Sequence, residues 1–439
     1  MRAIARADPT PRERSARCCG LTVLTHLSAA VALAFAARTA RFDAGWFDIP
    51  LIDASPMQAL PPISIIVPAR NEARSIERCV RSLLAQRHVD AEIIVVDDRS
   101  EDATPQILAQ LALEFPQLRV LSGESLPEGW VGKPWALHQG ARYARGDWYL
   151  FTDADSRHEP AATASALSFA LGAQTDALSI VTAQELGSFW ERATLPFILA
   201  MILYASGTFE QINDPLQPER ALANGQYILV SRAAYDGLGG HAALRGELVD
   251  DVSFARNLKA DGRFRLLLGG GTRLARVRMY HSFGEIWEGF TKNLFVGARG
   301  NVPALLGAVA YMTALSAPPV LALRAALRGR SYESAEALAA AATTVVTMMH
   351  GIGVVGMPRA TAFLQPLGTA ILAALAVNST LRVLSGRGVT WRGRRYSGRP
   401  SSRRTENAVP EHSVALKDMG CRSCELMTTK PDTHHGKTY

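Results

Sequence analysis

The stretch that decides the fold is residues 63–72, ISIIVPARNE, in which a short run of β-branched residues stops at Pro68. An apolar run of this length, closed by proline, predicts a buried strand that ends in a loop. The pattern repeats along the chain, with strands predicted at 92–96, 118–121 and 148–151 and helices at about 73–85, 103–114 and 134–144. Strands that alternate with helices of this length indicate βαβ units. The sequence therefore predicts an α/β domain with a mainly parallel sheet.

Carboxylates follow two of these predicted strands directly. Asp97 and Asp98 end one strand, and Asp153 and Asp155 follow another in the sequence TDAD. The carboxyl ends of parallel strands meet at one edge of a sheet, where ligands bind. Two carboxylates one residue apart on a turn suit a hard divalent ion together with phosphate oxygens, and a carboxylate after the second strand suits a nucleotide base or ribose. The alternatives are a solvated loop for Asp153 and Asp155, and helix capping for Asp97 and Asp98.

Three more charged residues lie at predicted helix starts. Asp250 and Asp251 precede a helix at 252–260, where they either complement the helix dipole or supply a general base. Lys133 opens the helix that follows Gly132, and a cation there is unfavourable beside the dipole unless an anionic ligand compensates. A solvated lysine is the alternative.

Two further candidates lie between the α/β region and the apolar region that follows it. Lys292 is placed to meet a diphosphate, and His281 is a candidate metal ligand. A packed or exposed histidine remains the alternative for His281.

Long apolar runs lie outside the α/β region. They occupy residues 21–37, 301–323, 335–357 and 362–384. The last three have the length of membrane-spanning helices, and Pro318 and Pro319 are expected to break the first of these three. A buried helical subdomain is the alternative. The apolar stretch at 190–204 is expected either to lie against a membrane or to form a core helix.

The composition and the charge distribution agree with a membrane protein. The chain has 439 residues, of which 48% are hydrophobic and 20% are charged, and its formal net charge of +7 comes largely from its two ends. Basic clusters beside apolar runs mark the cytoplasmic face of a membrane protein. No basic face with interleaved aromatic residues accompanies them, which argues against nucleic-acid binding. Three full spans after the α/β region would place the arginines of 387–404 outside, so one run is expected to be re-entrant or interfacial.

The cysteines do not indicate a disulfide framework. Their spacing is irregular, which indicates a reducing compartment. Cys421 and Cys424 form a CxxC with His434 and His435 downstream, but a second cysteine pair for a zinc site is missing.

Four segments are expected. They are a basic N-terminus with an anchor helix and linker at 1–57, the α/β domain at 58–300, membrane helices at 301–385 and a basic, unstructured tail at 386–439.

Four motifs in this order resemble those of family 2 glycosyltransferases, which have the GT-A fold, a mainly parallel Rossmann-like sheet. They are ISIIVPARNE at 63–72, VVDDRSED at 95–102, TDAD at 152–155 and LVDD at 248–251. Further stretches are similar to the membrane-bound branch that glycosylates hopanoids, carotenoids or ceramides. They are GKPWAL at 132–137, FGEIW at 283–287 and VTWRGRRY at 389–396.

The resemblance implies an inverting, metal-dependent transferase. It would move a sugar from a nucleotide-diphosphate donor, with a leaning towards UDP, to the hydroxyl of a lipid or isoprenoid acceptor at the cell membrane, with the catalytic domain on the cytoplasmic side of a multi-pass protein. Asp251, beside Asp250, would be the catalytic base, and Asp153 and Asp155 would hold Mg²⁺ or Mn²⁺, with His281 as a further candidate ligand. The expected donor contacts are Arg70, Glu72, Asp97, Asp98, Lys133, Asp153 and Lys292. Residues 224–226 fall where contacts to the acceptor or donor sugar are expected.

One departure from the family pattern bears on the product. Processive polysaccharide synthases of this family carry a QxxRW motif, where this chain has EGFTKN at 288–293. This favours transfer of one or a few sugars. The alternatives are a synthase with an altered motif, a sugar nucleotidyltransferase, which lacks support because no glycine-rich loop follows Val67, and a non-catalytic scaffold protein.

Overall fold

The computed structural model describes residues 11–46, 52, 55–57, 59–297 and 300–396. The predicted unstructured segment 401–439, with Cys421, Cys424, His434 and His435, lies outside the described residues. So do the arginines before residue 11 and after residue 396.

Within the described residues, seven strands form the central sheet, in the order β3-β2-β1-β4-β8-β6-β9. They are β1 (Ile63–Ala69), β2 (Ala91–Asp97), β3 (Leu118–Ser122), β4 (Trp148–Phe151), β6 (Ala177–Val181), β8 (Ile228–Ser231) and β9 (Leu266–Gly270). The first four strands in this order are mutually parallel, and β8 runs antiparallel to both of its neighbours. The prediction of a mainly parallel α/β sheet is confirmed.

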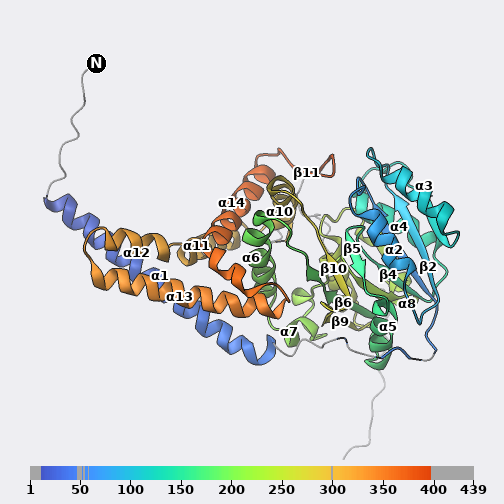
Figure 1. Ribbon diagram of the computed structural model, residues 1–439, viewed down its shortest axis with the longest axis horizontal. Coiled ribbons are helices and arrows are strands. Elements are labelled where there is room, and N and C mark those ends of the chain that lie inside the picture. Colours follow the sequence, from blue (N-terminus) through green and yellow to red (C-terminus); the bar gives the residue numbers. More distant parts are fainter. Residues whose placement is uncertain (1–10, 47–51, 53–54, 58, 298–299, 397–439) are drawn as a thin grey trace, which may run out of the picture. The chain divides into compact units, whose positions relative to one another are not determined.

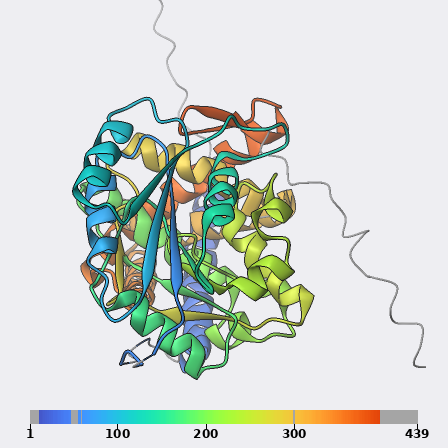
Figure 2. The same cartoon turned by 90° about the vertical axis from the view of Figure 1, so that its right-hand side faces the viewer.

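Helices cover both faces of this sheet (Figure 2). One face packs against α2 (Ile76–Leu84), α3 (Thr104–Glu114) and α5 (Ala162–Gly172), and the other against α4 (Gly132–Tyr143), α8 (Arg232–Gly237) and α9 (Asp250–Asp261). Ile63, Ile65 and Val67 of β1 belong to the first core, whereas Ile66 belongs to the second. Because both faces are buried, these strands are nearly continuous apolar runs, which is why the sequence revealed them.

The remaining elements of the α/β domain are small. A second sheet joins β5 (Ser156–His158), β10 (Ala275–Val277) and β7 (Ala183–Gln184), with β10 in the middle. The short helices of this domain are α7 (Phe209–Asn213), η1 (Pro218–Arg220) and η2 (Gly240–Leu244), whereas η3 (Arg359–Leu364) lies later in the chain, between α13 and α14. Through β5, the second sheet holds the segment that directly follows Asp155.

The apolar runs form helices. They are α1 (Pro11–Trp46), α11 (Val302–Ser316), α12 (Pro318–Ala326), α13 (Ser331–Val354) and α14 (Gln365–Leu384). Among the described residues, three segments are long and apolar enough to cross a membrane, namely Thr22–Ala40, Ser331–Gly353 and Arg359–Leu384. Helices α11 and α12 form a fourth candidate, bent by 43° at the break where the sequence placed Pro318 and Pro319.

These apolar helices divide into two groups by their contacts (Figure 1). Helix α13 packs along α1 and α12, and the Oγ1 of Thr22 in α1 donates to Glu333 in α13 at 2.7 Å. Helix α14 packs along α11, and also along α6 (Phe189–Ser206) and α10 (Phe283–Gly297) of the α/β domain. Gly368 of α14 makes close contact with α6, because a Cβ at this position would collide with Phe197. At the other end of α14, the Oγ of Ser379 donates to the carbonyl of Thr291 at 2.6 Å.

A two-stranded hairpin follows α14, built from β11 (Val389–Trp391) and β12 (Arg394–Tyr396). Arg392 and Gly393 connect the strands with φ values of 48° and 77°, the left-handed conformation that a two-residue type I′ turn requires at both positions. Val389 is fully buried in a cluster with Leu248, Phe295 and Ala376. The structure therefore differs from the expected unstructured tail, because residues 389–396 are folded against the rest of the protein.

Candidate active site

A cavity of about 640 Å³ lies at the carboxyl ends of β1, β2 and β4. The structure brings together around it most of the charged residues that the sequence singled out. They are Arg70, Glu72, Asp98, Lys133, Asp153, Asp155, Asp250, Asp251 and Lys292. The parallel sheet explains this convergence, since it aligns the ends of strands that lie far apart in sequence.

Lys133 forms an ion pair with the first carboxylate of the DxD motif. Its Nζ lies 2.6 Å from Oδ1 of Asp153, at the N-terminal turn of α4. Burial alone would lower the pKa of Lys133, but the attraction of Asp153, Asp250 and Asp251 outweighs it and raises the pKa. Lys133 is therefore a charged member of the site rather than a solvated surface lysine.

The second carboxylate of the motif lacks a partner for one oxygen. Among the described residues, no hydrogen-bond donor reaches Oδ1 of Asp155, which is buried. Burial, followed by the nearby charges of Asp153 and Glu72, raises the pKa of Asp155 well above its ordinary value. Buried oxygens without a donor are costly and rare, so this atom is suited to a cation that the structure does not contain.

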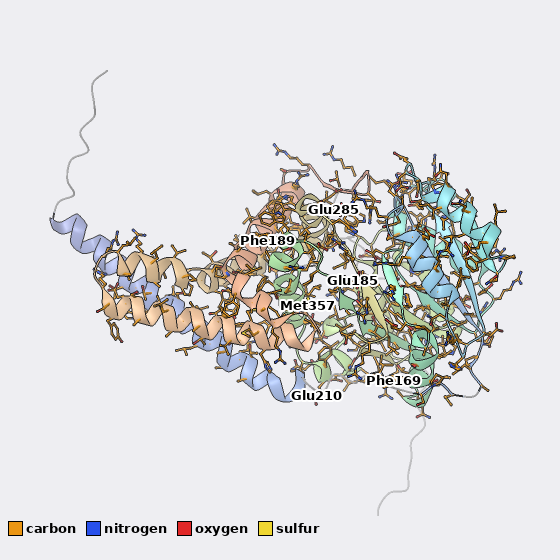
Figure 3. All side chains as sticks on the ribbon, viewed as in Figure 1. Phe169, Glu185, Phe189, Glu210, Glu285 and Met357 are labelled. Atoms are coloured by element: carbon orange, nitrogen blue, oxygen red, sulfur yellow. The ribbon has the colours of Figure 1, made fainter. Side chains whose placement is uncertain are left out.

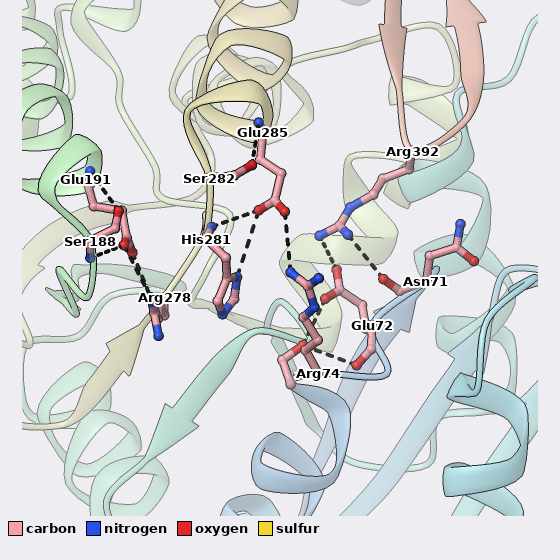
Figure 4. A network of polar contacts seen from close by, with 11 residues as sticks. Asn71, Glu72, Arg74, Ser188, Glu191, Arg278, His281, Ser282, Glu285 and Arg392 are labelled. Atoms are coloured by element: carbon pink, nitrogen blue, oxygen red, sulfur yellow. Dashed lines mark hydrogen bonds and ion pairs between the residues drawn. The ribbon is translucent and has the colours of Figure 1, made fainter.

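The described residues hold no group of three or more His, Cys, Asp or Glu side chains arranged to bind a metal ion. The expected set of Asp153, Asp155 and His281 does not form one. The backbone N–H of His281 donates to Glu285 at 2.8 Å, and its ring also faces Glu285 (Figure 4). His281 is not among the residues that line the cavity.

Asp97 also lies outside the cavity lining. Its Oδ1 accepts the backbone N–H of Ser100 at 3.2 Å, in the turn after β2. Asp97 therefore stabilises the turn after β2. This differs from the helix capping expected as its alternative, because α3 begins only at Thr104 and its N-cap is Ala103. Asp98 faces the cavity.

Asp250 and Asp251 begin α9 and have different surroundings. Asp251 accepts backbone N–H groups at both oxygens, from Gly225 at 2.9 Å and from Val252 at 2.8 Å. These two bonds fix the orientation of its carboxylate towards the cavity. Asp250 is buried, and burial raises its pKa to about 6 although Lys133 opposes the shift.

Gly225 allows its backbone to lie close to the side chains of Lys133 and Asp251. A Cβ at this position would lie 2.8 Å from Nζ of Lys133 and 3.1 Å from Oδ2 of Asp251. The neighbouring Asn224 is fixed by its Nδ2, which donates to the carbonyl of Ile180 at 3.0 Å. Gln226 also lines the cavity, so the predicted segment 224–226 lies at the site as a whole.

The sequence prediction missed Arg392 and Arg394, which enter the cavity from the hairpin. Both terminal nitrogens of Arg394 bind Asp98, at 2.5 and 3.0 Å. Arg392 binds Glu72 at 2.5 Å and also donates to the carbonyl of Asn71 (Figure 4). The detectable signal was the pair Arg392–Gly393 between two short alternating stretches, which is typical of a hairpin turn.

Lys292 and Trp391 connect the hairpin to α10. The Nζ of Lys292 lies 4.7 Å from the centre of the Trp391 ring, a cation–π geometry. Burial lowers the pKa of Lys292, and Asp250 opposes this shift. Both side chains line the cavity.

The far half of the cavity is apolar and is walled by helices. Its lining includes Ile198, Leu199, Ile202 and Leu203 of α6, Leu305, Ala308 and Met312 of α11, and Leu372 and Ala376 of α14. Met357, in the connection between α13 and α14, completes this half (Figure 3). The same cavity therefore joins a carboxylate-rich end to a hydrocarbon-like end.

The chain is similar in sequence to known glycosyltransferases. Residues 64–239 match the family model described as Glycosyl transferase family 2. A 4,4'-diaponeurosporenoate glycosyltransferase from Staphylococcus haemolyticus is 28% identical over 249 residues, which are 56% of this chain and 64% of that relative. The protein of the same name from Staphylococcus aureus (strain USA300) is 26% identical over 66% of this chain and 76% of its own length. The match thus spans less than two thirds of the first relative.

Among solved structures, a mannosyltransferase from Pyrobaculum calidifontis in complex with GDP-Man and Mn²⁺ is similar over 83% of this chain and 99% of its own chain. The sequence identity is 19% and the TM-score is 0.46.

Proposed function

Since residues 64–239 make this chain a member of glycosyl transferase family 2, we propose that it transfers a sugar from a nucleotide-diphosphate sugar to a lipid acceptor at a membrane surface. The observation that carries this proposal is the single cavity that joins five aspartates to an apolar half. The carboxylate-rich end suits a metal-bound diphosphate, and the apolar end suits a hydrocarbon chain.

The donor would occupy the end of the cavity at the sheet. Asp98 would accept hydrogen bonds from the base or ribose, with Arg70 and Glu72 beside it. Lys133 would pair with the diphosphate, since it is already charged and lies at the N-terminus of a helix. The relatives leave the nucleotide open, so UDP and GDP sugars are both candidate donors.

Asp153 and Asp155 would hold Mg²⁺ or Mn²⁺ together with donor oxygens. The buried Oδ1 of Asp155, which has no donor among the described residues, supports this assignment. The described residues also offer no third protein ligand, which leaves coordination positions for the phosphates and water. When bound, the ion neutralises the charge that develops on the leaving diphosphate.

Asp251 would act as the general base. Its carboxylate, fixed by Gly225 and Val252, would take the proton of the acceptor hydroxyl as the oxygen bonds to the anomeric carbon. The bond from that carbon to the diphosphate breaks in the same step, which inverts the anomeric configuration. Asp250 would share the proton-accepting environment, because it lies beside the base and near both lysines.

The acceptor would lie along α6, α11 and α14 with its hydroxyl towards Asp251. The relatives are named as 4,4'-diaponeurosporenoate glycosyltransferases. The apolar lining of this half of the cavity suits a hydrocarbon chain. We therefore propose a lipid or isoprenoid acceptor that enters from the bilayer.

The path of the chain supports a specific membrane topology. The chain leaves the α/β domain after α10 and returns to it at β11, where Arg394 meets Asp98. The number of membrane crossings between these points must therefore be even. Helices α11–α12 and α13 would supply two crossings. Helix α14 would lie on the domain side, because besides α11 it packs along α6 and α10 of the α/β domain. The protein would thus be multi-pass with α14 interfacial, and the arginines after α14 would lie with the domain on the cytoplasmic face.

Transfer can be tested with the full-length protein in lipid nanodiscs. Labelled UDP and GDP sugars are supplied with Mn²⁺ and extracted membrane lipids, and we expect a labelled lipid that carries one or a few sugars. Long polysaccharide chains would instead identify a processive synthase, and intact donor with every lipid fraction would contradict the proposal.

The topology can be tested by labelling single cysteines in a background without the native ones. Ser385→Cys, after α14, should react from the face that carries the catalytic domain, and Arg328→Cys, between α12 and α13, from the opposite face. Labelling of both from the face opposite the domain would show that α14 crosses the membrane, and labelling of both from the domain face would show that α11–α12 does not.

A further inference from the structure

The β11–β12 hairpin forms a wall of the cavity opposite the sheet. It is anchored at Val389, which is buried among helices, and at Trp391, which packs against α10 and α14. The cavity is lined by Trp391 itself, together with Arg392, Arg394 and Tyr396. The side chain of Arg395, in contrast, is exposed, and its Nε donates to the carbonyl of Arg387 at 2.7 Å. The hairpin thus directs two of its three basic side chains, those of Arg392 and Arg394 but not of Arg395, into the site.

The charges around the cavity show what these two arginines do. Its acidic lining residues are Glu72, Asp98, Asp153, Asp155, Asp250 and Asp251. Its basic lining residues are Arg70, Lys133, Arg256, Lys292, Arg392 and Arg394. With the hairpin the two sets balance in formal charge, whereas without it the acids exceed the bases by two. An anionic donor would then be repelled from the site until a metal ion had bound.

Arg394 also lies where the proposed donor has to bind. Its two-pronged contact with Asp98 involves the carboxylate that is expected to meet the base or ribose. A Cβ on Gly132, the residue before Lys133, would collide with the same guanidinium. Arg394 is therefore next to the helix N-terminus that the diphosphate would approach. If the base or ribose of the donor binds Asp98, the guanidinium of Arg394 is displaced from that carboxylate. The diphosphate of the donor is then the anionic group that lies near it.

We propose that Arg392 and Arg394 are donor-binding residues that hold the diphosphate, and that Glu72 and Asp98 occupy their guanidinium groups until the donor arrives. The inference rests on the proposed function and extends it to a segment outside the α/β domain. Arginine is suited to this role because its planar fork matches two phosphate oxygens at once. The contacts are exchangeable, since the side chains of Arg392 and Arg394 are 32% and 18% exposed.

The experiment compares Arg394→Gln and Arg392→Gln with the wild type in the full-length protein in nanodiscs. Isothermal titration with UDP and with GDP in the presence of Mn²⁺ measures nucleotide binding. Inhibition of transfer by uridine or guanosine, which lack phosphates, measures nucleoside binding alone. We expect each variant to bind the nucleoside diphosphate at least tenfold more weakly while inhibition by the nucleoside changes less than twofold. Arg394→Lys keeps the positive charge but loses the planar, two-pronged guanidinium. Its affinity for the nucleoside diphosphate should lie between those of the wild type and Arg394→Gln.

Arg395→Gln is the matched control, because it removes a positive charge from the same strand on its exposed side. It should bind the diphosphate as the wild type does, and it should keep the thermal unfolding midpoint of the wild type. Equal loss of nucleoside and diphosphate binding would show that Arg394 acts only by shaping Asp98 and would overturn the inference. Unchanged diphosphate binding in both glutamine variants would overturn it as well. A wild type that binds neither UDP nor GDP would instead overturn the proposed function together with it.

Discussion

The ammonium group of Lys133 lies 2.6 Å from the carboxylate of Asp153. One partner is expected to bind the donor diphosphate and the other the metal ion that accompanies it. In the protein alone, each therefore neutralises the other. Metal and donor have to separate this pair, which links their binding.

Lys133→Gln should affect the two ligands in opposite directions. Asp153 loses its counter-charge, so Mn²⁺ alone should bind more tightly, whereas UDP or GDP without metal should bind more weakly. Each change should be about twofold to fivefold, the scale of a partly exposed ion pair. Calorimetric titration of each ligand separately measures both effects. Arg142→Gln, in the last turn of the same helix, is the control and should change neither. Tighter binding of both ligands would contradict the assigned roles.

Asp155→Asn should remove the effect of metal on nucleotide binding. The amide has the size of the carboxylate but supplies no negative charge to a cation. We expect Mn²⁺ to strengthen UDP or GDP binding in the wild type and not in this variant. Asp147→Asn provides the control, since Asp147 is exposed and precedes the strand that Asp155 follows. An undiminished Mn²⁺ effect in Asp155→Asn would refute the metal site.

Asp251→Asn should stop the chemical step without loss of the donor. Removal of a general base typically lowers the rate by about 10²- to 10⁴-fold. The asparagine keeps an acceptor for the N–H of Gly225, so the KM for the donor should stay within twofold. Steady-state kinetics with the lipid acceptor measure both constants, and Asp261→Asn, at the end of the same helix, should behave as the wild type. A kcat close to that of the wild type would show either that another residue is the base or that the acceptor needs no base.

The pH dependence of stability should carry the signature of Asp250. Its pKa is about 6 in the folded protein, above the ordinary value of 3.8, because burial disfavours the charged form. The folded state therefore holds this proton more strongly than the unfolded state does. The stability from this site is fully present below pH 3.8 and is lost as the pH rises to about 6. Unfolding midpoints of the wild type and Asp250→Asn between pH 4 and 7 should show a smaller decline in the variant. Parallel profiles would contradict the assignment.

Ala308→Phe should block the apolar half of the cavity. Ala308 lines this half on α11, so a phenyl ring there takes up space that an acceptor chain needs. We expect the KM for the lipid acceptor to rise at least tenfold while donor binding stays unchanged. Ala310→Phe adds the same ring on the exposed side of the same helix and serves as the control. Equal acceptor kinetics in the two variants would place the acceptor elsewhere.

The sequence revealed the α/β domain because its signals are local. The run of Ile63–Val67 is buried on both faces, and Asp98, Asp153 and Asp155 directly follow buried strands. Strand order then brings these aspartates to one cavity without any further information. Their chemical roles remain predictions, since geometry alone does not test them.

The hairpin and the position of α14 were not predictable by the same means. Arg394 meets Asp98 across 296 residues, and no local pattern at either position indicates the other. The composition of α14 has the character of a membrane span, but Gly368 and Ser379 fit it closely to α6 and α10. His281 and Asp97 were candidates because of residue type and position, and tertiary structure directs both away from the cavity.

The place of the hairpin in the chain sets the order in which the enzyme is completed. Ribosomes release the first strand, Ile63–Ala69, more than three hundred residues before Arg392 and Arg394. All the apolar helices after the α/β domain have to be synthesised and folded before these arginines reach Asp98 and Glu72. A nascent domain that has not yet acquired them has an incomplete nucleotide site, so competence for catalysis would follow membrane insertion.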